Sequence, residues 1–295
     1  MKTVTVRVPG STSNLGSGFD TLGLAVNRYS FLTLTRTNGS EFTVESASGS
    51  GASKTVLKIL REASSYFFKT SGKKPFGLTA SLEGNLPPGR GLGASATARV
   101  GILLALNELT QTGLDSGVLL QMATYLEHHP DNASPALFGG FTVSGLVNDR
   151  VQCLHFPVSS RIKLVTLIPE FQIDTERARK LMPKEYSKAD AAHALNRAAL
   201  ISAAFVSGQY ELLRGVFDDR FHQPYRERLL PQLSKVIRAG QKAGAVGGWL
   251  SGSGSAIMCL TLQKAEQICE AMHRVLPKSE MHILRAENRA AEVWC

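Results

Sequence analysis

The amino-acid sequence predicts an α+β fold made of two parts. Segments with strand-like and helix-like patterns alternate along all 295 residues. Some neighbouring strand-like segments are close enough to pair antiparallel and others are separated by helical crossovers, which argues against a doubly wound parallel sheet. A proline and two serines within residues 156–160 separate the halves, so we expect domains over residues 1–157 and 158–295.

The first half is expected to contain mainly strands, with helices where apolar residues repeat every three to four positions. Val4, Val6 and Val8 alternate with polar residues, which is the period of a half-buried strand. A helix over residues 95–109 is apolar on nearly every side and should be buried. The expected strands cover residues 3–8, 22–26, 30–35, 76–82 and 138–143, with a turn over 10–18 and a loop with a short strand over 38–51. The other expected helices cover residues 54–66 and 117–127.

The second half is expected to alternate strands and helices in the same way. Two apolar runs are joined by a glycine-serine turn, which is typical of a hairpin between two core strands. The expected strands cover residues 163–168, 245–250, 256–262 and 281–286. The expected helices cover residues 174–181, 189–206, 224–243 and 265–275.

The composition places the chain among globular proteins. Hydrophobic residues make up 43% and charged residues 19%, which is too apolar for a disordered chain. No stretch approaches the ~18 to 20 apolar residues of a spanning helix, and the first residues lack the apolar core of an export signal. The cysteines are scattered without a C-x-x-C pair, so we expect reduced thiols in a cytoplasmic protein: Cys153, Cys259, Cys269 and Cys295.

The formal net charge of +9 suits a polyanionic partner, either a nucleoside triphosphate or a nucleic acid. The Lys and Arg residues are spread along the chain, and no run of them alternates with aromatic residues. This pattern favours a solvated basic surface over a nucleic-acid groove.

A glycine-rich segment, P-P-G-R-G-L-G-A-S-A over residues 87–96, precedes the buried helix. Glycines at a helix start let the backbone approach an anion, and the free N–H groups attract phosphate. The segment lacks the Lys of a Walker A loop and the third Gly of a dinucleotide fingerprint. By itself such a turn is more often structural, but the hydroxyl of Ser95 can reach a metal bound to phosphates.

Two other glycine-rich segments are ambiguous when each is taken alone. In residues 9–20, Asn14 and Asp20 bracket a turn, and both residue types also form turns without any ligand. Residues 247–255, G-G-W-L-S-G-S-G-S, fit either a plain hairpin turn or a backbone cradle for a ligand.

Together, the three segments resemble the three motifs of the GHMP kinases, which include galactokinase, homoserine kinase, mevalonate kinase and phosphomevalonate kinase. The matching patterns are, in order, P-x-S-x-x-N-L-G-x-G-F-D, P-x-x-x-G-L-G-x-S-A and L-S-G-S-G. Residues 127–132, E-H-H-P-D-N, resemble the E-G-H-P-D-N signature of homoserine kinases. Residues 174–183 are similar to their T-x-x-x-R-x-x-x-P helix, and H-Q-P-Y-R over residues 222–226 is a third match. The resemblance to homoserine kinases covers roughly residues 4–260.

The resemblance implies a two-domain GHMP kinase fold, with an N-terminal ATP-binding domain similar to ribosomal protein S5 and a ferredoxin-like C-terminal domain. It implies ATP-dependent phosphorylation of the side-chain hydroxyl of L-homoserine to O-phospho-L-homoserine, in threonine biosynthesis, with ATP and Mg²⁺ as cofactors. It also implies a cytoplasmic enzyme acting on small molecules, without a nucleic-acid or membrane partner, and it allows a homodimer.

The resemblance also assigns site residues. Arg179 and Arg226 stand at the positions that bind the substrate carboxylate, which suits the fork geometry of guanidinium groups. The implied ATP-binding residues are Pro87, Pro88, Gly89, Arg90, Gly91, Leu92, Gly93, Ala94, Ser95, Ala96 and Thr97. The implied substrate-binding residues are Asn14, Asp20, His129, Asn132, Arg179, Arg226 and Gly252. The implied catalytic residues are Asn132, His129 and Ser95, and the implied metal ligands are Ser95 and Glu127.

No general base is assigned. Some GHMP kinases have an Asp where homoserine kinases, and this chain, have an Asn, which is Asn132 here. Asp131 is adjacent, but neighbouring residues on a turn usually point different ways, so we expect transfer without a dedicated base. The chain departs from the family pattern at His128 in place of Gly, Ala94 in place of Ser, and Ser255 in place of Pro. The change at His128 puts the metal role of Glu127 in question.

Two alternatives remain open from the sequence. Another small-molecule GHMP kinase, such as a mevalonate-type enzyme, would not explain Arg179 and Arg226. A non-catalytic basic module would bind RNA in a salt-sensitive way and would tolerate loss of Arg179.

Overall fold

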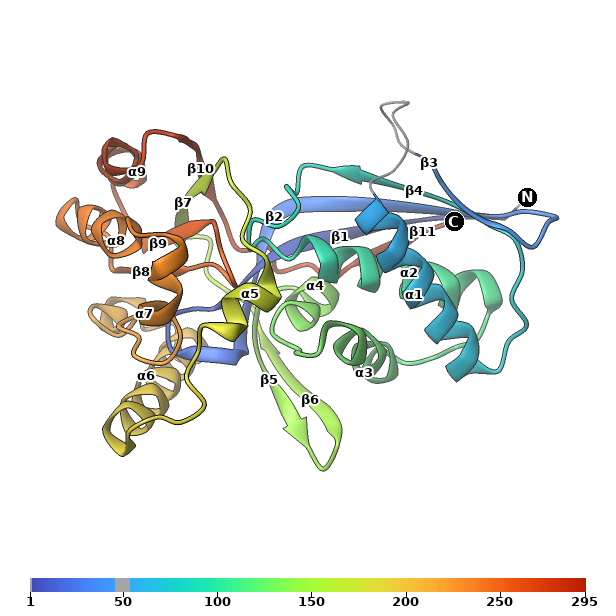
Figure 1. Ribbon diagram of the computed structural model, residues 1–295, viewed down its shortest axis with the longest axis horizontal. Coiled ribbons are helices and arrows are strands. Elements are labelled where there is room, and N and C mark those ends of the chain that lie inside the picture. Colours follow the sequence, from blue (N-terminus) through green and yellow to red (C-terminus); the bar gives the residue numbers. More distant parts are fainter. Residues whose placement is uncertain (1, 46–53) are drawn as a thin grey trace.

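The computed structural model describes residues 2–45 and 54–295 as two sheets with helices packed on them (Figure 1). Part of the loop expected over residues 38–51 lies outside the described residues, and β3, Phe42–Glu45, is the short strand expected there. Among the described residues, no helix is both long and apolar enough to cross a membrane.

The first sheet has the strand order β11-β1-β2-β4-β3, and the β5–β6 hairpin extends it from β2. All described pairs are antiparallel except β3 with β4, which are parallel and are connected through α1. The strands are β1 (Thr3–Asn14), β2 (Gly18–Arg36), β3, β4 (Leu78–Gly84), β5 (Phe141–Val147), β6 (Arg150–Phe156) and β11 (Glu292–Trp294).

The strands β1 and β2 are longer than the sequence predicts. The glycine- and serine-rich residues up to Asn14 were expected to form a turn, but they continue β1 opposite residues 18–26. Register shifts at Pro9/Gly10 and Ser13/Asn14 bend the pair, so the strand passes through residues that usually interrupt one. The bend brings the polar residues of β1 to the site described below.

The described residues of the first part form four helices: α1 (Lys54–Ser71), α2 (Ala94–Thr110), α3 (Ser116–Glu127) and α4 (Ala133–Phe138). The prediction of a buried helix over residues 95–109 is confirmed, because α2 is buried over most of its length. The strand expected from residue 138 is wrong at its start. Residue 138 ends α4, and Gly139 and Gly140, both with positive φ, turn the chain before β5 begins.

The second sheet has the order β10-β7-β9-β8, and its described pairs are all antiparallel. Its strands are β7 (Lys163–Pro169), β8 (Gly247–Leu250), β9 (Ile257–Thr261) and β10 (Ser279–Leu284). The helices α8 (Leu233–Lys242) and α9 (Ala265–Val275) pack on it through a common apolar core. A helix crosses over after β7 and another after β9, so the strands lie in the spatial order 4-1-3-2 of a ferredoxin-like domain, as expected.

The long helix expected over residues 224–243 is wrong. The chain instead forms α7 (Gln223–Arg226), a 3₁₀ turn (Glu227–Leu229) and α8. Pro231 explains the break, because a residue before proline avoids helical geometry, and Leu230 is accordingly non-helical, with φ −142° and ψ 77°. The remaining helices are α5 (Thr175–Lys180), α6 (Lys188–Ser207) and the 3₁₀ turn Tyr210–Leu213.

Two strands were not predicted. β6 completes a hairpin with β5, and β11 pairs with β1, so the last residues return to the first sheet although the sequence places them in the second domain. Both chain ends therefore lie side by side (Figure 1). A shared core that includes Leu22, Phe141, Phe205 and Trp249 joins the two parts. The boundary between residues 157 and 158 stays a prediction.

Candidate active site

The three glycine-rich segments meet between the two parts of the molecule. The backbone N–H of Ser11 donates to the oxygen of Leu92 at 3.1 Å, which joins the first segment to the second. The hydroxyl of Ser251 donates to the oxygen of Gly91 at 2.5 Å, which joins the third to the second. Three segments that are far apart in the sequence are thus hydrogen-bonded to one another in the folded chain.

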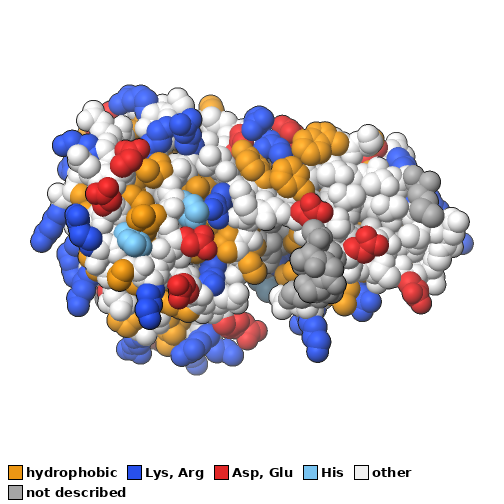
Figure 2. Space-filling model, turned by 90° about the horizontal axis from the view of Figure 1, so that it is seen from above, with side chains coloured by type: hydrophobic (Ala, Val, Ile, Leu, Met, Phe, Trp, Pro, Cys, Tyr) orange, Lys and Arg blue, Asp and Glu red, His pale blue; other side chains and the backbone are white. Residues whose placement is uncertain are grey.

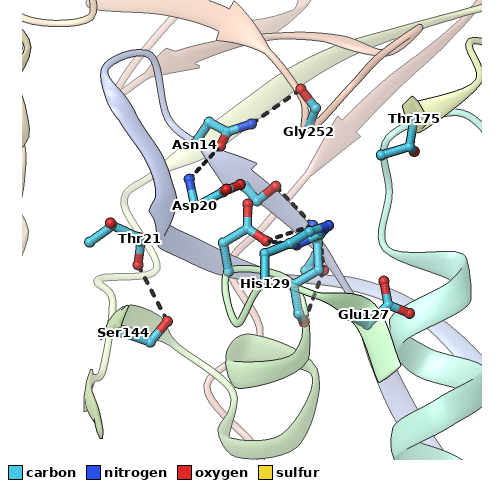
Figure 3. A network of polar contacts seen from close by, with 12 residues as sticks. Asn14, Asp20, Thr21, Glu127, His129, Ser144, Thr175 and Gly252 are labelled. Atoms are coloured by element: carbon cyan, nitrogen blue, oxygen red, sulfur yellow. Dashed lines mark hydrogen bonds and ion pairs between the residues drawn. The ribbon is translucent and has the colours of Figure 1, made fainter. Parts of the chain in front are cut away.

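Asn14 joins the first segment to the third. Its buried side chain donates from Nδ2 to the oxygen of Gly252 at 3.2 Å and accepts at Oδ1 from the N–H of Asp20 at 3.1 Å (Figure 3). Asn14 and Asp20 both have positive φ, which Asn and Asp tolerate better than most residues. The two predicted residues therefore lie together and are fixed by the turn.

The loop before α2 leaves no room for side chains at two glycines. Gly91 and Gly93 have φ of +77° and +72°. A Cβ at Gly91 would lie 2.0 Å from the oxygen of Ser251, and one at Gly93 would lie 2.2 Å from the hydroxyl of Ser11. Gly93 is also the N-cap of α2, and it makes no side-chain cap for the first turn of that helix. An uncapped N-terminus of a long helix is suited to bind phosphate.

Several loop residues can contribute only their backbone. Leu92 and Ala96 are buried, and the hydroxyl of Thr97 donates to the oxygen of Ala94 at 2.9 Å and contacts Ser30 at 3.0 Å. The guanidinium of Arg90 donates to the oxygen of Pro169, away from the helix start. The predicted role of residues 87–97 as an ATP-binding segment therefore stays a prediction about the loop backbone.

Ser95 and Glu127 lie next to each other, as a shared metal would require. The hydroxyl of Ser95 donates to Oε2 of Glu127 at 3.0 Å, while Arg99 forms an ion pair with the other carboxylate oxygen. A hydroxyl and a carboxylate are the hard oxygen donors that Mg²⁺ prefers, so these residues fit the ion. His128, which replaces a glycine of the family pattern, takes up the left-handed C-cap of α3 and so does not remove Glu127 from this position.

Asn132 is held between two serines of β1. Its Nδ2 donates to the hydroxyl of Ser13 at 2.9 Å, and its Oδ1 accepts from the hydroxyl of Ser11 at 2.9 Å. The expectation that Asp131 points away from it is wrong, since Nδ2 of Asn132 also lies 3.3 Å from Oδ1 of Asp131. The side chains of Asp131 and Asn132 therefore share one polar cluster.

His129 and Asp131 form a short, buried pair in this cluster. Nδ1 of His129 lies 2.6 Å from Oδ1 of Asp131. Burial alone would lower the pKa of His129, but the charge and hydrogen bond of Asp131, with Asp20 and Glu127, outweigh it and raise that pKa. Burial likewise opposes ionisation of Asp131, but His129 holds the pKa of Asp131 below its ordinary value. Asp20 and His129 face each other, with Glu127 to one side (Figure 3).

Arg179, on α5, faces the same cluster. It binds the carboxylate of Asp20 with both terminal nitrogens, at 3.0 and 2.6 Å, and its guanidinium lies 5.1 Å from the ring centroid of Phe19. About a third of both side chains is exposed. The charge of Arg179 is thus already balanced by Asp20.

Arg226, on α7, contacts the ring of Phe19 as Arg179 does, but it is only 2% exposed. Its guanidinium is 5.3 Å from the Phe19 centroid, and Nη1 donates to the oxygen of Gly252 at 2.9 Å. Burial, with the nearby charge of Arg179, lowers the pKa of Arg226 to about 10. Among the residues that the structure describes, its buried Nε has no hydrogen-bond partner. A buried guanidinium without a carboxylate partner of its own is suited to bind an anion.

A network that was not predicted supports Arg226. Nδ1 of His222 lies 3.2 Å from Nη1 of Arg226, and its Nε2 lies 2.8 Å from the backbone oxygen of Gly16. Because a carbonyl oxygen can only accept a hydrogen bond, Nε2 of His222 carries the hydrogen and donates it. Asp219 accepts from the N–H groups of His222 and Gln223 at 3.0 and 2.7 Å. Burial lowers the pKa of His222. Its neutral form can therefore accept the Arg226 hydrogen bond at Nδ1.

Five residues of the site were not predicted: Ser11, Ser13, Phe19, Asp219 and His222. Two signals were present: the hydroxyls of the S-T-S stretch alternate with the period of a strand, and His222 begins the H-Q-P-Y-R match. All seven residues expected to bind substrate lie around this one cluster. It offers two guanidinium groups, two carboxylates and an amide near an uncapped helix start, which suits a small zwitterion beside a polyphosphate.

Comparison with known proteins agrees with this geometry. Residues 49–140 match the GHMP kinases N terminal domain, and residues 191–278 match the GHMP kinases C terminal domain. The chain is 36% identical to a homoserine kinase of Aquifex aeolicus, with 99% of both chains covered. It is 39% identical to a homoserine kinase of Carboxydothermus hydrogenoformans, over 87% of this chain and 84% of that one.

Solved structures agree with the fold. The crystal structure of homoserine kinase from Cytophaga hutchinsonii superposes with a TM-score of 0.86 at 25% identity, covering 100% of this chain and 98% of that one. A mevalonate kinase structure, 13% identical, superposes with a TM-score of 0.70 and covers 97% of this chain and 99% of that one. The predicted two-domain GHMP kinase fold is confirmed.

Proposed function

Because the chain belongs to the homoserine kinase family of the GHMP kinases, we propose that it transfers the γ-phosphoryl group of ATP to the side-chain hydroxyl of L-homoserine. The product is O-phospho-L-homoserine, an intermediate of threonine biosynthesis. The observation that carries the substrate assignment is the meeting of Arg179 and Arg226 over the ring of Phe19, opposite Asp20.

The substrate is a small zwitterion, and the cluster offers partners for both of its charges. Within the described part of the chain, Arg226 forms no ion pair with a carboxylate, so the substrate carboxylate supplies the anion and Arg179 contacts it from the exposed side. Asp20 then accepts from the ammonium group, while Asn14 holds its backbone in place. The bound substrate displaces water from the exposed part of Arg179, which strengthens the attraction of that guanidinium for the carboxylate, while Arg226 is already buried.

The ATP phosphates bind at the start of α2 in this proposal. The loop backbone around Gly91 and Gly93 approaches the phosphates closely because neither residue carries a side chain, and the N–H groups of the first helical turn donate to phosphate oxygens. When bound, Mg²⁺ neutralises charge on the phosphates. Ser95 and Glu127 would hold it, with the ion pair to Arg99 orienting the Glu127 carboxylate.

Asn132 positions the attacking hydroxyl. Ser11 and Ser13 fix its amide in one orientation, so Asn132 can direct a hydroxyl without a search for rotamers. We assign no general base, because a loose transition state needs positioning and charge stabilisation more than proton removal. Asn132→Ala should therefore lower turnover. Full turnover of Asn132→Ala together with inactive Asp131→Ala would instead make Asp131 the proton acceptor.

The alternatives from the sequence are not favoured. The mevalonate kinase structure shares the fold at 13% identity, whereas curated homoserine kinases reach 39% identity. An RNA-binding module is disfavoured by the kinase family match. On the face seen from above, Lys and Arg side chains are dispersed among acidic ones and form no continuous stripe (Figure 2). We expect action in the cytoplasm on small molecules alone.

A coupled assay that detects ADP tests the proposal, with homoserine, mevalonate and galactose offered side by side. Homoserine should be the preferred acceptor by a wide margin in kcat/KM. A preference for mevalonate or galactose would refute the substrate assignment, and failure of calorimetry to detect binding of either ATP or homoserine would refute the kinase proposal itself.

A further inference from the structure

Asp131 is a buried carboxylate that the proposed reaction leaves without a role. It lies in the turn between α3 and α4 and is 2% exposed. Among the residues that the structure describes, it forms no ion pair with a Lys or an Arg. Burial of a carboxylate opposes folding unless the charge is paired and hydrogen-bonded, so the partners of Asp131 indicate what this charge is for.

The partners of Asp131 are side chains of the polar cluster at the site. Nδ1 of His129 lies 2.6 Å from Oδ1 of Asp131, and Nδ2 of Asn132 donates to the same oxygen at 3.3 Å. The hydroxyl of Ser13, which accepts from Asn132, also forms a hydrogen bond with the carboxylate. The described contacts of this charge are therefore made to two residues that face the substrate and to the serine that holds one of them.

The backbone of Asp131 is held in place on two sides. Gly23 of β2 packs against the turn, and a Cβ at Gly23 would come within 2.1 Å of the backbone oxygen of Asp131. The N–H of Ser134 donates to the oxygen of Pro130 at 2.9 Å, which joins the turn to the start of α4. A turn fixed in this way leaves the carboxylate little freedom, as a residue that orients others requires.

The pairing with Asp131 decides which nitrogen of His129 faces the substrate. An ionised carboxylate can only accept, so Nδ1 of His129 carries a hydrogen and Nε2 lies on the other side of the ring. Within residues 2–45 and 54–295, Nε2 has no hydrogen-bond partner. His129 faces Asp20 across the site (Figure 3). Nε2 of the neutral ring is thus available to accept from the ammonium or hydroxyl group of homoserine.

We propose that Asp131 is a positioning residue, which fixes the ring and the tautomer of His129 and through His129 orients homoserine for phosphoryl transfer. Because its carboxylate is buried behind His129 and Asn132, Asp131 itself neither touches the substrate nor takes up its proton. The inference rests on the proposed function, since it assigns a task within the same site. It extends that function by giving the His129–Asp131 pair an effect on homoserine and none on ATP.

Asp131→Asn tests this role, because it keeps the shape of the side chain and removes the charge. The Nδ2 group of the amide can donate to Nδ1 of His129, which moves the ring hydrogen to Nε2 and removes the acceptor that faces homoserine. We expect kcat/KM for homoserine to fall about 100-fold, with the KM for ATP unchanged. Steady-state kinetics measures both, and circular dichroism confirms that the variant folds.

Asp218→Asn is the matched control, because it also removes a carboxylate from a histidine. Oδ2 of Asp218 lies 3.2 Å from Nε2 of His193 on α6, and the Asp218 side chain is more than half exposed. We expect its kcat/KM for homoserine to stay within about twofold of the wild-type value.

A double-mutant cycle separates positioning from a direct role in the reaction. If Asp131 acts through His129, Asp131→Asn should change kcat/KM by less than about threefold in a His129→Ala background. A loss of about 100-fold in both backgrounds would overturn the proposal, because Asp131 would then act on the substrate or its proton directly. Unchanged kinetics of Asp131→Asn in the wild-type background would overturn it as well.

Nitrogen NMR of the histidine-labelled chain, at a pH where the ring is neutral, reads the tautomer without any turnover. The signal that His129→Ala removes should report a hydrogen on Nδ1 in the wild-type chain and on Nε2 in Asp131→Asn. A hydrogen on Nε2 alone in the wild-type chain would overturn the positioning role even if homoserine is phosphorylated. A chain with the Nδ1 hydrogen that phosphorylates no homoserine would instead refute the proposed function and leave the assignment of the tautomer standing.

Discussion

The loop before α2 and the arginine pair beside Phe19 attract negative charge by different means. The loop is built from backbone, and its key positions, Gly91 and Gly93, have no side chain at all. The arginine pair is built from full charges on two separate helices, α5 and α7. A substitution at either glycine of the loop adds atoms where there is no space. A substitution of either arginine removes a charge, and the contribution of that charge to anion binding depends on the groups around it.

The two arginines also differ from each other. Arg179 is partly exposed and already bound to Asp20, and burial, the largest single influence on its pKa, is outweighed by Asp20, so that the pKa is raised. Arg226 is buried, and burial lowers its pKa to about 10. An anion arriving at the site therefore gains more from Arg226 than from Arg179.

The largest effect is expected from Arg226→Ala. We expect kcat/KM for homoserine to fall about 1,000-fold, or ~4 kcal/mol, because a buried charge facing the substrate carboxylate is lost. The KM for ATP should not change. Arg228→Ala is the control, since Arg228 is exposed just after α7. Steady-state kinetics with each substrate varied in turn measures both, and a loss confined to ATP would contradict the assignment.

Gly91→Ala should weaken ATP binding about 100-fold, measured by calorimetry, because its Cβ would collide with the oxygen of Ser251 and displace the loop. Gly72→Ala is the matched control. Gly72 also has a positive φ, of +68°, but no atom of residues 2–45 or 54–295 lies within 4 Å of its Cβ position, apart from Gly72 and its chain neighbours. It should lower the free energy of unfolding by ~1 kcal/mol and leave ATP binding intact. Equal ATP affinity in both variants would show that the loop does not hold the phosphates.

Arg179→Ala should raise the KM for homoserine about 30-fold with ATP binding intact, a smaller effect than that of Arg226→Ala. The reason is that Asp20 already balances the charge of Arg179, and water screens its exposed third. If Arg179→Ala weakened the use of homoserine as much as Arg226→Ala does, the conclusion that Arg226 contributes more to substrate binding would be wrong.

The smallest effect concerns His222. Its folded pKa is lowered by burial, so the unfolded state binds more protons once the pH falls below about 6.5, and the free energy of unfolding should decrease there. Protonation of the folded protein would also fill Nδ1, which accepts from Arg226, but it begins only at a lower pH because the folded pKa is lowered, and the KM for homoserine should rise only there. Urea unfolding between about pH 5 and pH 7.5 measures the stability change.

His222→Asn should flatten that pH dependence by about 1 kcal/mol while its Oδ1 still accepts from Arg226. If the free energy of unfolding fell equally with pH in the variant and the wild-type chain, a group other than His222 would be responsible for the pH dependence.

Much of the site was predictable because its signals are local. The order of the three glycine-rich segments and the Ser95 hydroxyl can be read within short stretches of sequence, and the roles of the two arginines follow from the resemblance to homoserine kinases. All seven expected substrate-binding residues lie around one cluster. Asp131 was misjudged, because a general rule about turns does not fix a side chain that a neighbouring histidine captures. Asp219 was missed because its role, holding backbone N–H groups beneath His222, has no sequence signal of its own.

The sequence by itself determined the elements whose cause lies within a few residues. The alternation of Val4, Val6 and Val8 fixes a strand, the apolar residues of α2 fix a buried helix, and Pro231 divides α7 from α8. Only the tertiary structure decided how distant segments meet. β11 returns to pair with β1, and Arg226 is buried behind Phe19 without a carboxylate of its own. Local sequence patterns predict the backbone geometry and burial of one helix or strand. The charge state of a side chain and the residues it contacts depend on atoms from distant parts of the chain.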